Sequence, residues 1–462
     1  MTTLANLSDH QLEQLKLFEP EGSVTPDNGD SYFSDPSFAN NKTRPIHRWV
    51  PWIAGFSSSF VRDVLQMYLE SQGTVLDPFC GVGTALVEAL LCGHNAIGFE
   101  INPYAAQASR TKVNAHLITV SELECEISRF QAFYKSKTSD GYVPKSTPPE
   151  GFRTRSEFYS PRVLHKVLIL QDFIDTITDS NLREIFRLAF ASTMVRYSNY
   201  SYEPSLGRRV SAGKQEILDF PVGQAIVNKL LEMLVDTSWF QENLRAEPPS
   251  AQVINDSFFN HQKYLPPASV DLIVTSPPYL NNYHYNRNTR PQLYWLGYAE
   301  HPKDMKPLEQ SNFGKYWQTV RERDRLDLEF SLPSADLEEQ LQTLRQLKPE
   351  KGIYGGNGWA NYAAAYFNDC YTFAKSIKRT LKPNATALVV IGNSILQGVM
   401  IPTDQYFGKI SESIGLELVR IDVPRATRVG NSIIQSDIRV VKAKKSHQLY
   451  EAIVELRNTD IT

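Results

Sequence analysis

The sequence predicts an α/β fold in which helices cover both faces of a mostly parallel sheet. Two observations support this class. Short β-rich runs alternate with helical runs from residue 74 onward, and a glycine-rich bend joins the first of these strands to its helix. The predicted strands are 74–79, 95–101, 251–256, 270–276, 385–394, 416–424 and 436–445. The predicted helices are 84–93, 103–116, 359–381 and 403–414.

Each of these elements follows from a local pattern. The strand at 74–79 is a short apolar run, typical of a strand buried on both faces. Its helix ends at Gly93, a residue suited to a helix C-terminus. The segment 359–381 is long and amphipathic, as expected of a helix packed on a sheet. The runs 416–424 and 436–445 look like two closing strands.

The bulk composition narrows the class of protein. The chain has 462 residues, of which 42% are hydrophobic, so it can form a large core and more than one structural unit. A net charge of −3 means that any surface for nucleic acid must be local. The four cysteines form no CxxC pair and the histidines show no metal-binding spacing, so we expect no metal site.

The sequence also favours a place inside the cell. Its cysteine usage is that of a reducing compartment, and no apolar run is long enough to span a bilayer. The N-terminus is polar and shows no secretion signal. We therefore expect a cytoplasmic protein with no membrane contact.

The stretch "VLDPFCGVGTALVEAL" carries the first chemical signal. A strand ends at Asp77, and Gly81 and Gly83 then form a bend that opens a helix. Glycines let the backbone approach a ligand, and the helix start offers unpaired N–H groups. Glu100 ends the next strand, where a carboxylate can hold the ribose hydroxyls of an adenosine-containing cofactor. No Gly-Lys-Ser/Thr follows, so the bend is not a P-loop.

Several motifs together resemble the amino-methylating DNA methyltransferases. "DPFCGVGT" resembles their S-adenosylmethionine motif and "TSPPY" their catalytic motif. "GFEINP" and "IND" resemble their ribose and adenine segments, and "HRWVPWIAGFSSSFV" the segment that closes over the methionine end. The resemblance covers 47–108 and 251–283, and more loosely 355–445. It implies a Rossmann-like class I methyltransferase with a seven-stranded, mostly parallel sheet and helical insertions.

The same resemblance implies the residues that hold S-adenosylmethionine. They come from the glycine bend, the two acid-bearing strand ends, the closing segment and the catalytic corner. They are Phe56, Ser57, Asp77, Pro78, Phe79, Gly81, Gly83, Thr84, Glu100, Ile101, Asn255, Asp256 and Ser276.

The stiff corner "TSPPY" has a chemical reading. An exocyclic amine is a poor nucleophile because its lone pair is delocalised into the ring. The Ser276 side chain and the Pro277 carbonyl can accept its two hydrogens and aim that lone pair at the methyl group. Pro277 and Pro278 hold the carbonyl in place, which is preorganisation. Tyr279 can stack on a base that has been flipped out of the duplex.

The sequence leaves two candidates for the amine that is methylated. A serine at the first position of this corner favours N4 of cytosine, and the alternative is N6 of adenine. Methylation at C5 needs a cysteine nucleophile, typically after proline, and no cysteine here follows proline. An RNA methyltransferase and a catalytically silent nucleic-acid binder are further alternatives.

Two long segments interrupt the strand–helix pattern and indicate how the protein contacts DNA. Aromatic and basic residues mix directly after the corner, and we expect Arg287 and Arg290 to contact DNA. The expected partners are double-stranded DNA with a flipped base and a cognate restriction endonuclease. The expected parts are 1–46, an N-terminal extension; 47–116, the cofactor part; 117–250, a helical insertion for target recognition; 251–283, the catalytic part; 284–358, a second, DNA-facing insertion; and 359–462, the C-terminal part of the methyltransferase domain.

Overall fold

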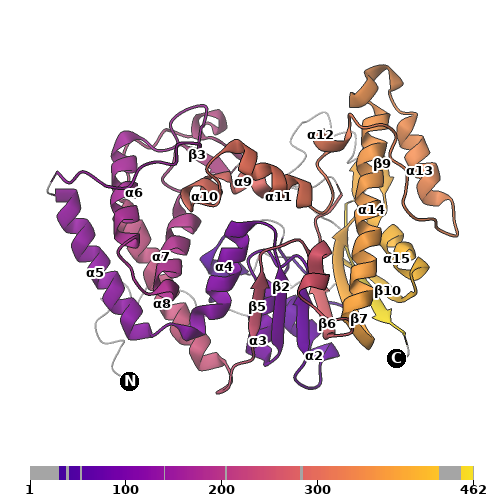
Figure 1. Cartoon of the computed structure of the whole chain (residues 1–462), viewed down its shortest axis with the longest axis horizontal. Helices are drawn as coiled ribbons and strands as arrows, with labels where there is room; N and C mark the ends of the chain where they lie inside the picture. Colours follow the sequence, from indigo (N-terminus) through magenta and orange to yellow (C-terminus); the bar gives the residue numbers. More distant parts are fainter. Residues whose placement is uncertain are drawn as a thin grey trace.

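A central sheet organises the protein (Figure 1). The computed structural model describes residues 31–37, 41–52, 55–139, 141–202, 205–280, 285–425 and 449–460. Within them the sheet has seven strands in the order β10-β11-β7-β6-β1-β2-β5. Their bounds are β1 (Thr74–Asp77), β2 (Asn95–Phe99), β5 (Ala251–Ile254), β6 (Val270–Thr275), β7 (Leu381–Gly392), β10 (Leu416–Arg425) and β11 (Glu451–Asn458).

The strand directions confirm the predicted fold class. The strands from β5 to β7 run parallel to their neighbours, whereas β11 is antiparallel to both β7 and β10. The sheet is therefore mostly parallel, with one reversed strand inserted near its edge. The predicted strand at 436–445 lies outside the described residues. The seventh strand of the described sheet is β11, which was not predicted from the sequence; its charged residues interrupt the apolar pattern.

Alternate residues of the central strands face two different cores. Val75 and Val274 join the core on one face, and Leu76 and Ile273 join the core on the other. The first face is covered by α2 (Ser58–Tyr68), α3 (Thr84–Cys92) and α4 (Pro103–Val113). The second is covered by η5 (Phe258–Lys263), α14 (Gly356–Thr380) and α15 (Thr403–Ser413). Strands buried on both faces explain why the sequence shows continuous apolar runs.

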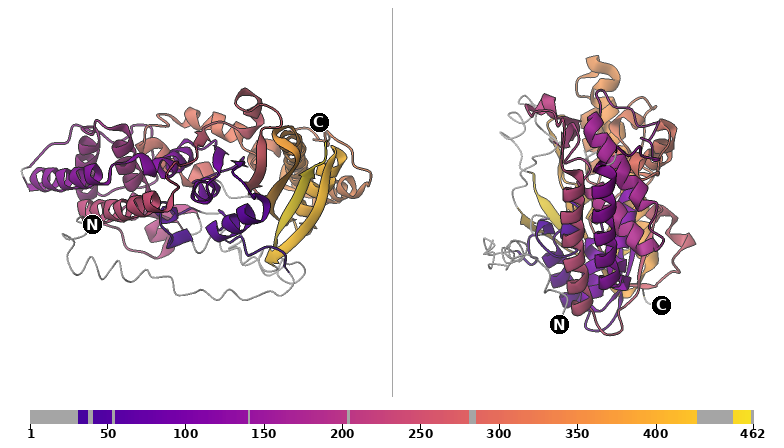
Figure 2. Two further views of the ribbon diagram at one scale, coloured as in Figure 1. Left: turned by 90° about the horizontal axis from the view of Figure 1, so that it is seen from below. Right: turned by 90° about the vertical axis from the view of Figure 1, so that its left-hand side faces the viewer.

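The first insertion is a helical bundle beside the sheet. Figure 2 shows it at the end of the molecule opposite to β10 and β11. It contains α5 (Val120–Ser139), α6 (Pro161–Ile174), α7 (Ser180–Thr193), α8 (Val222–Asn243) and the hairpin β3 (Tyr200–Tyr202) and β4 (Leu206–Arg208). Its buried Phe130 and Phe186 belong to the same continuous core as Leu86 of α3. The bundle is thus fused to the cofactor half by a shared core.

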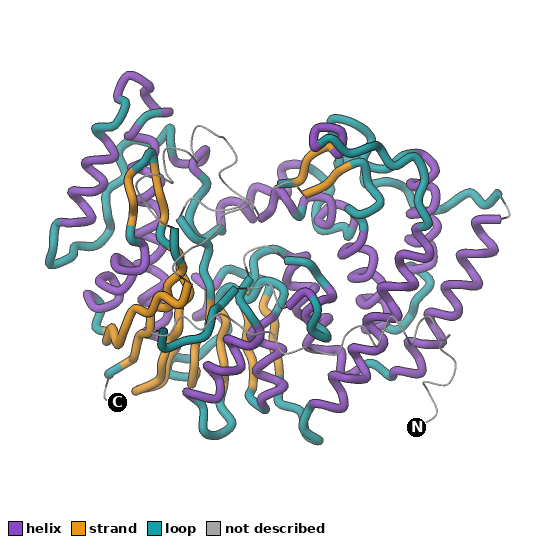
Figure 3. The backbone as a smooth tube through the Cα atoms, turned by 180° about the vertical axis from the view of Figure 1, so that it is seen from behind, coloured by secondary structure: helices purple, strands orange, loops and turns teal. Residues whose placement is uncertain are grey.

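The segment after the catalytic corner crosses the top of the sheet. Its helices are α9 (Tyr285–Asn288), α10 (Arg290–Trp295), α11 (Met305–Ser311), α12 (Trp317–Val320) and α13 (Asp336–Arg345). Leu293 packs in the core of the helical bundle, whereas Val320 and Leu337 pack in the core beneath α14. Figure 3 shows these helices bridging the two sides above the strand ends. Tyr294 and Trp295 of α10 are buried.

A short hairpin, β8 (Ser394–Leu396) and β9 (Val399–Ile401), follows β7. Among the described residues, no helix is long and apolar enough to cross a bilayer.

Candidate active site

The glycine bend after β1 is tight for two separate reasons. Gly81 has φ +51°, and a Cβ there would lie 3.1 Å from Nε1 of Trp52. Gly83 is the N-cap of α3 with φ +86°, and a Cβ there would lie 2.5 Å from Oγ of Ser109. Only glycine meets both the positive φ and the close approach. The bend therefore places main-chain atoms without side chains at the carboxyl end of β1.

Asp77 stabilises this bend through hydrogen bonds. It is buried, and its Oδ1 accepts hydrogen bonds from Oγ1 of Thr275 at 2.7 Å and from the backbone N–H of Phe79 at 3.0 Å. Burial raises the pKa of Asp77 to about 7, and the two hydrogen bonds oppose that rise. The bond to Thr275 links β1 to the residue before Ser276, so Asp77 ties the cofactor motif to the catalytic motif.

Glu100 lies at the end of β2 and faces the bend. Its Oε2 accepts the backbone N–H of Gly81 at 3.0 Å, and its Oε1 accepts that of Asn102 at 2.7 Å. Burial raises its pKa to about 7; the backbone donors lower it and the charge of Asp77 raises it. Each carboxylate oxygen keeps a further lone pair, so the group can still accept two hydroxyls.

The end of β5 supplies the second acid. Asp256 accepts hydrogen bonds from the backbone N–H of Ser257, from the Asn260 amide and from the Tyr264 hydroxyl. These donors hold the pKa of Asp256 below its usual value, although partial burial opposes them. Asn255 points elsewhere: its amide donates to the carbonyls of Glu100 and Ile101 and thereby joins the ends of β5 and β2.

The catalytic corner follows β6 directly. Ser276 and Tyr279 are half-buried, and the Oγ of Ser276 donates to the Tyr279 hydroxyl oxygen at 3.5 Å. The carbonyl of Pro278 accepts the Tyr366 hydroxyl at 3.1 Å. The corner is thus held by α14, on the face of the sheet opposite to the helical bundle.

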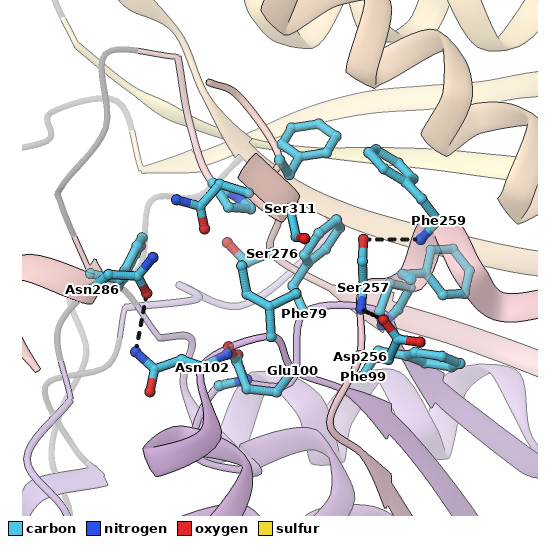
Figure 4. A pocket seen from close by; sticks show the side chains of 18 of the residues that line it. Phe79, Phe99, Glu100, Asn102, Asp256, Ser257, Phe259, Ser276, Asn286 and Ser311 are labelled. Atoms are coloured by element: carbon cyan, nitrogen blue, oxygen red, sulfur yellow. Dashed lines mark hydrogen bonds between the residues drawn. The ribbon is translucent and has the colours of Figure 1, made fainter. Parts of the chain in front are cut away.

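These strand ends surround one cavity (Figure 4). Its empty volume, including the open mouth, is about 730 Å³. Gly81 and Ser276 both line it, although they are far apart in the chain. Of the residues predicted to hold the cofactor or the amine, those lining the cavity are Pro78, Phe79, Gly81, Glu100, Ile101, Asp256, Ser276 and Pro278.

The other predicted residues lie outside this lining. Phe56 packs in the core beside Phe60, and Ser57 caps α2 through the backbone N–H of Phe60. Gly83 and Thr84 form the start of α3, where Thr84 accepts a hydrogen bond from the Asn41 amide. Asp77, Asn255, Pro277 and Tyr279 are likewise absent from the lining.

Several residues that line the cavity were not predicted from the sequence. Trp52 lies in the motif "HRWVPWIAGFSSSFV" and Asn102 in the motif "GFEINP", so these two motifs carried a signal for both residues. Asn286, from α9, is 2% exposed, and its amide nitrogen has no hydrogen-bond partner among the described residues. Ser311, Asn312 and Phe313 come from the second insertion, and no local pattern marks them. Only the folded chain brings them to the cavity.

The two predicted DNA-binding arginines lie in different settings. Arg287 is exposed on α9, next to the cavity-lining Asn286. Arg290 donates to the carbonyl of Arg153 at 3.0 Å and lies over the rings of Phe152 and Tyr294. Its guanidinium joins α10 to the first insertion.

The geometry defines a class of protein. A mostly parallel seven-stranded sheet with one reversed strand carries a glycine bend, two acids and a Ser-Pro-Pro corner around one cavity. This is the arrangement of the class I methyltransferase fold. Residues 28–111 match the N6/N4 methyltransferase family model, which is described as DNA methylase.

Distant relatives extend the likeness over most of the chain. The type II methyltransferase M.BsoBI of Geobacillus stearothermophilus is 25% identical over 484 residues, covering 96% of this chain and 92% of the relative. M.AvaI of Anabaena variabilis is 24% identical, covering 86% and 84%. M.MvaI of Kocuria varians is 22% identical, covering 79% and 81%. Among solved structures, the rRNA methyltransferase aviRa from Streptomyces viridochromogenes is 8% identical and covers 92% of this chain and 94% of its own, with a TM-score of 0.27. That score is too low to support a conclusion.

Proposed function

We propose that the protein transfers a methyl group from S-adenosylmethionine to the N4 amine of a flipped cytosine in double-stranded DNA. The observation that carries this proposal is the shared cavity. Gly81, Glu100 and Asp256 line one part of it, and Ser276 lines the same space from the next strand end. A donor and an amine held there are neighbours, which is what direct transfer requires.

The cavity residues match the chemistry of S-adenosylmethionine. Glu100 offers free lone pairs for ribose hydroxyls, and Asp256 offers an acceptor for the adenine amine beside the apolar ring of Phe259. Gly81 presents backbone to the methionine end, and the unsatisfied amide of Asn286 is a donor for a polar ligand. When bound, S-adenosylmethionine supplies an electrophilic methyl group.

The corner residues act on the amine. Ser276 is placed to accept one amine hydrogen and the Pro277 carbonyl the other, which localises the nitrogen lone pair. The Pro278 carbonyl is already engaged by Tyr366, so the rigid corner leaves Pro277 for the substrate. Tyr279 offers its ring to the extruded base.

The choice of cytosine depends on Ser276. A serine in first place favours N4 of cytosine, with N6 of adenine as the second candidate. The relatives M.BsoBI, M.AvaI and M.MvaI carry the name type II methyltransferase, which supports a DNA substrate and a role beside a restriction endonuclease. We assign sequence recognition to the helical insertion at 117–250, and further DNA contact to Arg287.

One experiment decides the base. Duplex DNA of mixed sequence is incubated with the protein and labelled S-adenosylmethionine, digested to nucleosides and analysed by mass spectrometry. We expect N4-methylcytosine. N6-methyladenine would overturn the choice of base, and label found only in a parallel sample of structured RNA would overturn the choice of DNA.

A further inference from the structure

The catalytic corner is fixed on both sides of Tyr279. Before it, the carbonyl of Pro278 accepts the hydroxyl of Tyr366 at 3.1 Å. After it, the carbonyl of Leu280 accepts the hydroxyl of Ser394 at 2.5 Å. Because the backbone is held at both neighbours, the Tyr279 side chain leaves the corner in a defined direction.

A chain of hydroxyl groups leads from the corner to a carboxylate. Ser276 Oγ donates to the hydroxyl oxygen of Tyr279 at 3.5 Å, and that hydroxyl donates to Oε1 of Glu451 at 3.3 Å. Both contacts are long for hydrogen bonds between oxygens, as catalytic contacts often are before the substrate binds. Glu451 begins β11, opposite Gly392 at the end of β7, and it is half-buried. Partial exposure lets it exchange a proton with water.

We propose that Glu451 accepts, through the hydroxyls of Tyr279 and Ser276, the proton that the target amine loses when it is methylated. This inference rests on the proposed function. Glu451 stands behind Tyr279 rather than in the cavity lining, so it is a positioning residue that acts through the two hydroxyls.

The proton balance is complete within the chain and the substrate. The amine lone pair forms the new N–C bond, and the electron pair of the broken C–S bond stays on sulfur. The nitrogen then carries a positive charge and both of its hydrogens. One passes to Ser276 Oγ as the serine hydrogen moves to Tyr279 and the tyrosine hydrogen moves to Glu451. The products are a neutral N-methylamine, two restored hydroxyls and a protonated Glu451, which later releases its proton to water.

Two conservative variants separate proton transfer from simple positioning. Glu451→Gln keeps an oxygen that accepts the Tyr279 hydroxyl but cannot take up a proton. Tyr279→Phe keeps the stacking ring and removes the hydroxyl. In single-turnover transfer from labelled S-adenosylmethionine to duplex DNA, we expect each variant to slow the rate at saturation about tenfold. That is below the range typical of general acid–base catalysis because water can partly replace the chain.

Measurements other than the rate distinguish a loss of proton transfer from a folding or binding defect. DNA affinity, measured by fluorescence anisotropy with S-adenosylhomocysteine present, should stay at the wild-type value in both variants. Added acetate should restore part of the rate of Glu451→Ala but none of that of Tyr279→Phe, because only the former keeps the two hydroxyls.

A matched control lies nearby. Asp404 accepts the hydroxyl of Tyr450 at 2.9 Å, a tyrosine–carboxylate pair outside the cavity lining. Asp404→Asn should therefore transfer methyl groups at the wild-type rate. A wild-type rate for Glu451→Gln, or a loss confined to KM for DNA, would overturn the relay while leaving the proposed function intact. Failure of the wild-type protein to methylate DNA would instead overturn the proposed function, and the relay with it.

Discussion

At the scale of single residues, the acids Asp77 and Glu100 are held in different ways. Asp77 is tied by a side chain of the catalytic strand, whereas Glu100 is tied by backbone N–H groups of the bend and of α4. Both carboxyl groups have a pKa raised to about 7, chiefly by burial. They are therefore partly protonated near neutral pH before any ligand binds.

This titration predicts that cofactor affinity depends on pH. Ionised Glu100 can accept both ribose hydroxyls, whereas the protonated acid loses an acceptor. A group with a raised pKa stays protonated until the pH passes about 7, so affinity should rise between pH 6 and pH 8. The dissociation constant of S-adenosylhomocysteine, measured by calorimetry across this range, tests the sign.

Glu100→Gln is the matched variant. It should bind S-adenosylhomocysteine about tenfold more weakly at pH 8, the loss expected for hydrogen bonds to a charged acceptor. It should also show a flatter pH dependence, with the remaining slope due to Asp77. A wild-type affinity that falls as pH rises would show that Glu100 is not the ribose acceptor.

At the scale of elements, the bend between β1 and α3 depends on backbone geometry. Gly83→Ala meets two penalties, a positive φ and a Cβ 2.5 Å from Oγ of Ser109. We expect a loss of unfolding free energy of about 2 kcal/mol in urea denaturation. Gly213→Ala is the control, because Gly213 has φ +72° with open space around it. Equal losses in the two variants would mean that the close packing against Ser109 adds nothing.

A second element-scale feature is the tie between α8 and the segment before α2. Buried Asp236 accepts hydrogen bonds from the backbone N–H of Ile46, the Arg48 guanidinium and the Trp49 indole. This segment continues to Trp52, which lines the cavity and stacks on Tyr285. The helical insertion therefore positions a wall of the cavity.

Removing this tie should be costly. Asp236→Ala leaves Arg48 without its carboxylate in a largely buried place, so we expect a loss of about 3 kcal/mol in unfolding free energy. Binding of S-adenosylhomocysteine should weaken as Trp52 loses its support. Glu417→Gln, which breaks an exposed pair with Arg457, should leave the unfolding midpoint unchanged. Unaltered stability of Asp236→Ala would refute this role of α8.

At the scale of the whole molecule, the sequence predicted the sheet better than the cavity. Continuous apolar runs marked β1, β2, β6 and β7, and the motifs placed Gly81 and Ser276 at one edge, where the structure has them. The strand β11 was missed because Glu451, Glu455 and Arg457 interrupt its apolar run. Asn286 and Phe313 were missed because a helix and a loop of the second insertion reach the cavity only through tertiary packing.

The shared core also changes how the helical insertion is best studied. Because Phe130 and Phe186 pack in the same core as α3, deleting residues 117–250 would expose the cofactor half. Sequence preference is better tested by exchanging exposed residues such as Arg208, at the end of the β3–β4 hairpin.

The glycine bend after β1 and the Ser-Pro-Pro corner after β6 meet at one cavity. Ser276→Ala tests this arrangement most directly. S-adenosylhomocysteine affinity and the single-turnover rate on duplex DNA are measured for the same preparation. We predict an affinity within about twofold of wild type and a rate at least about 100-fold lower, the usual loss when one preorganised catalytic contact is removed. Transfer at the wild-type rate would contradict the account, because the corner would then play no part in aiming the amine.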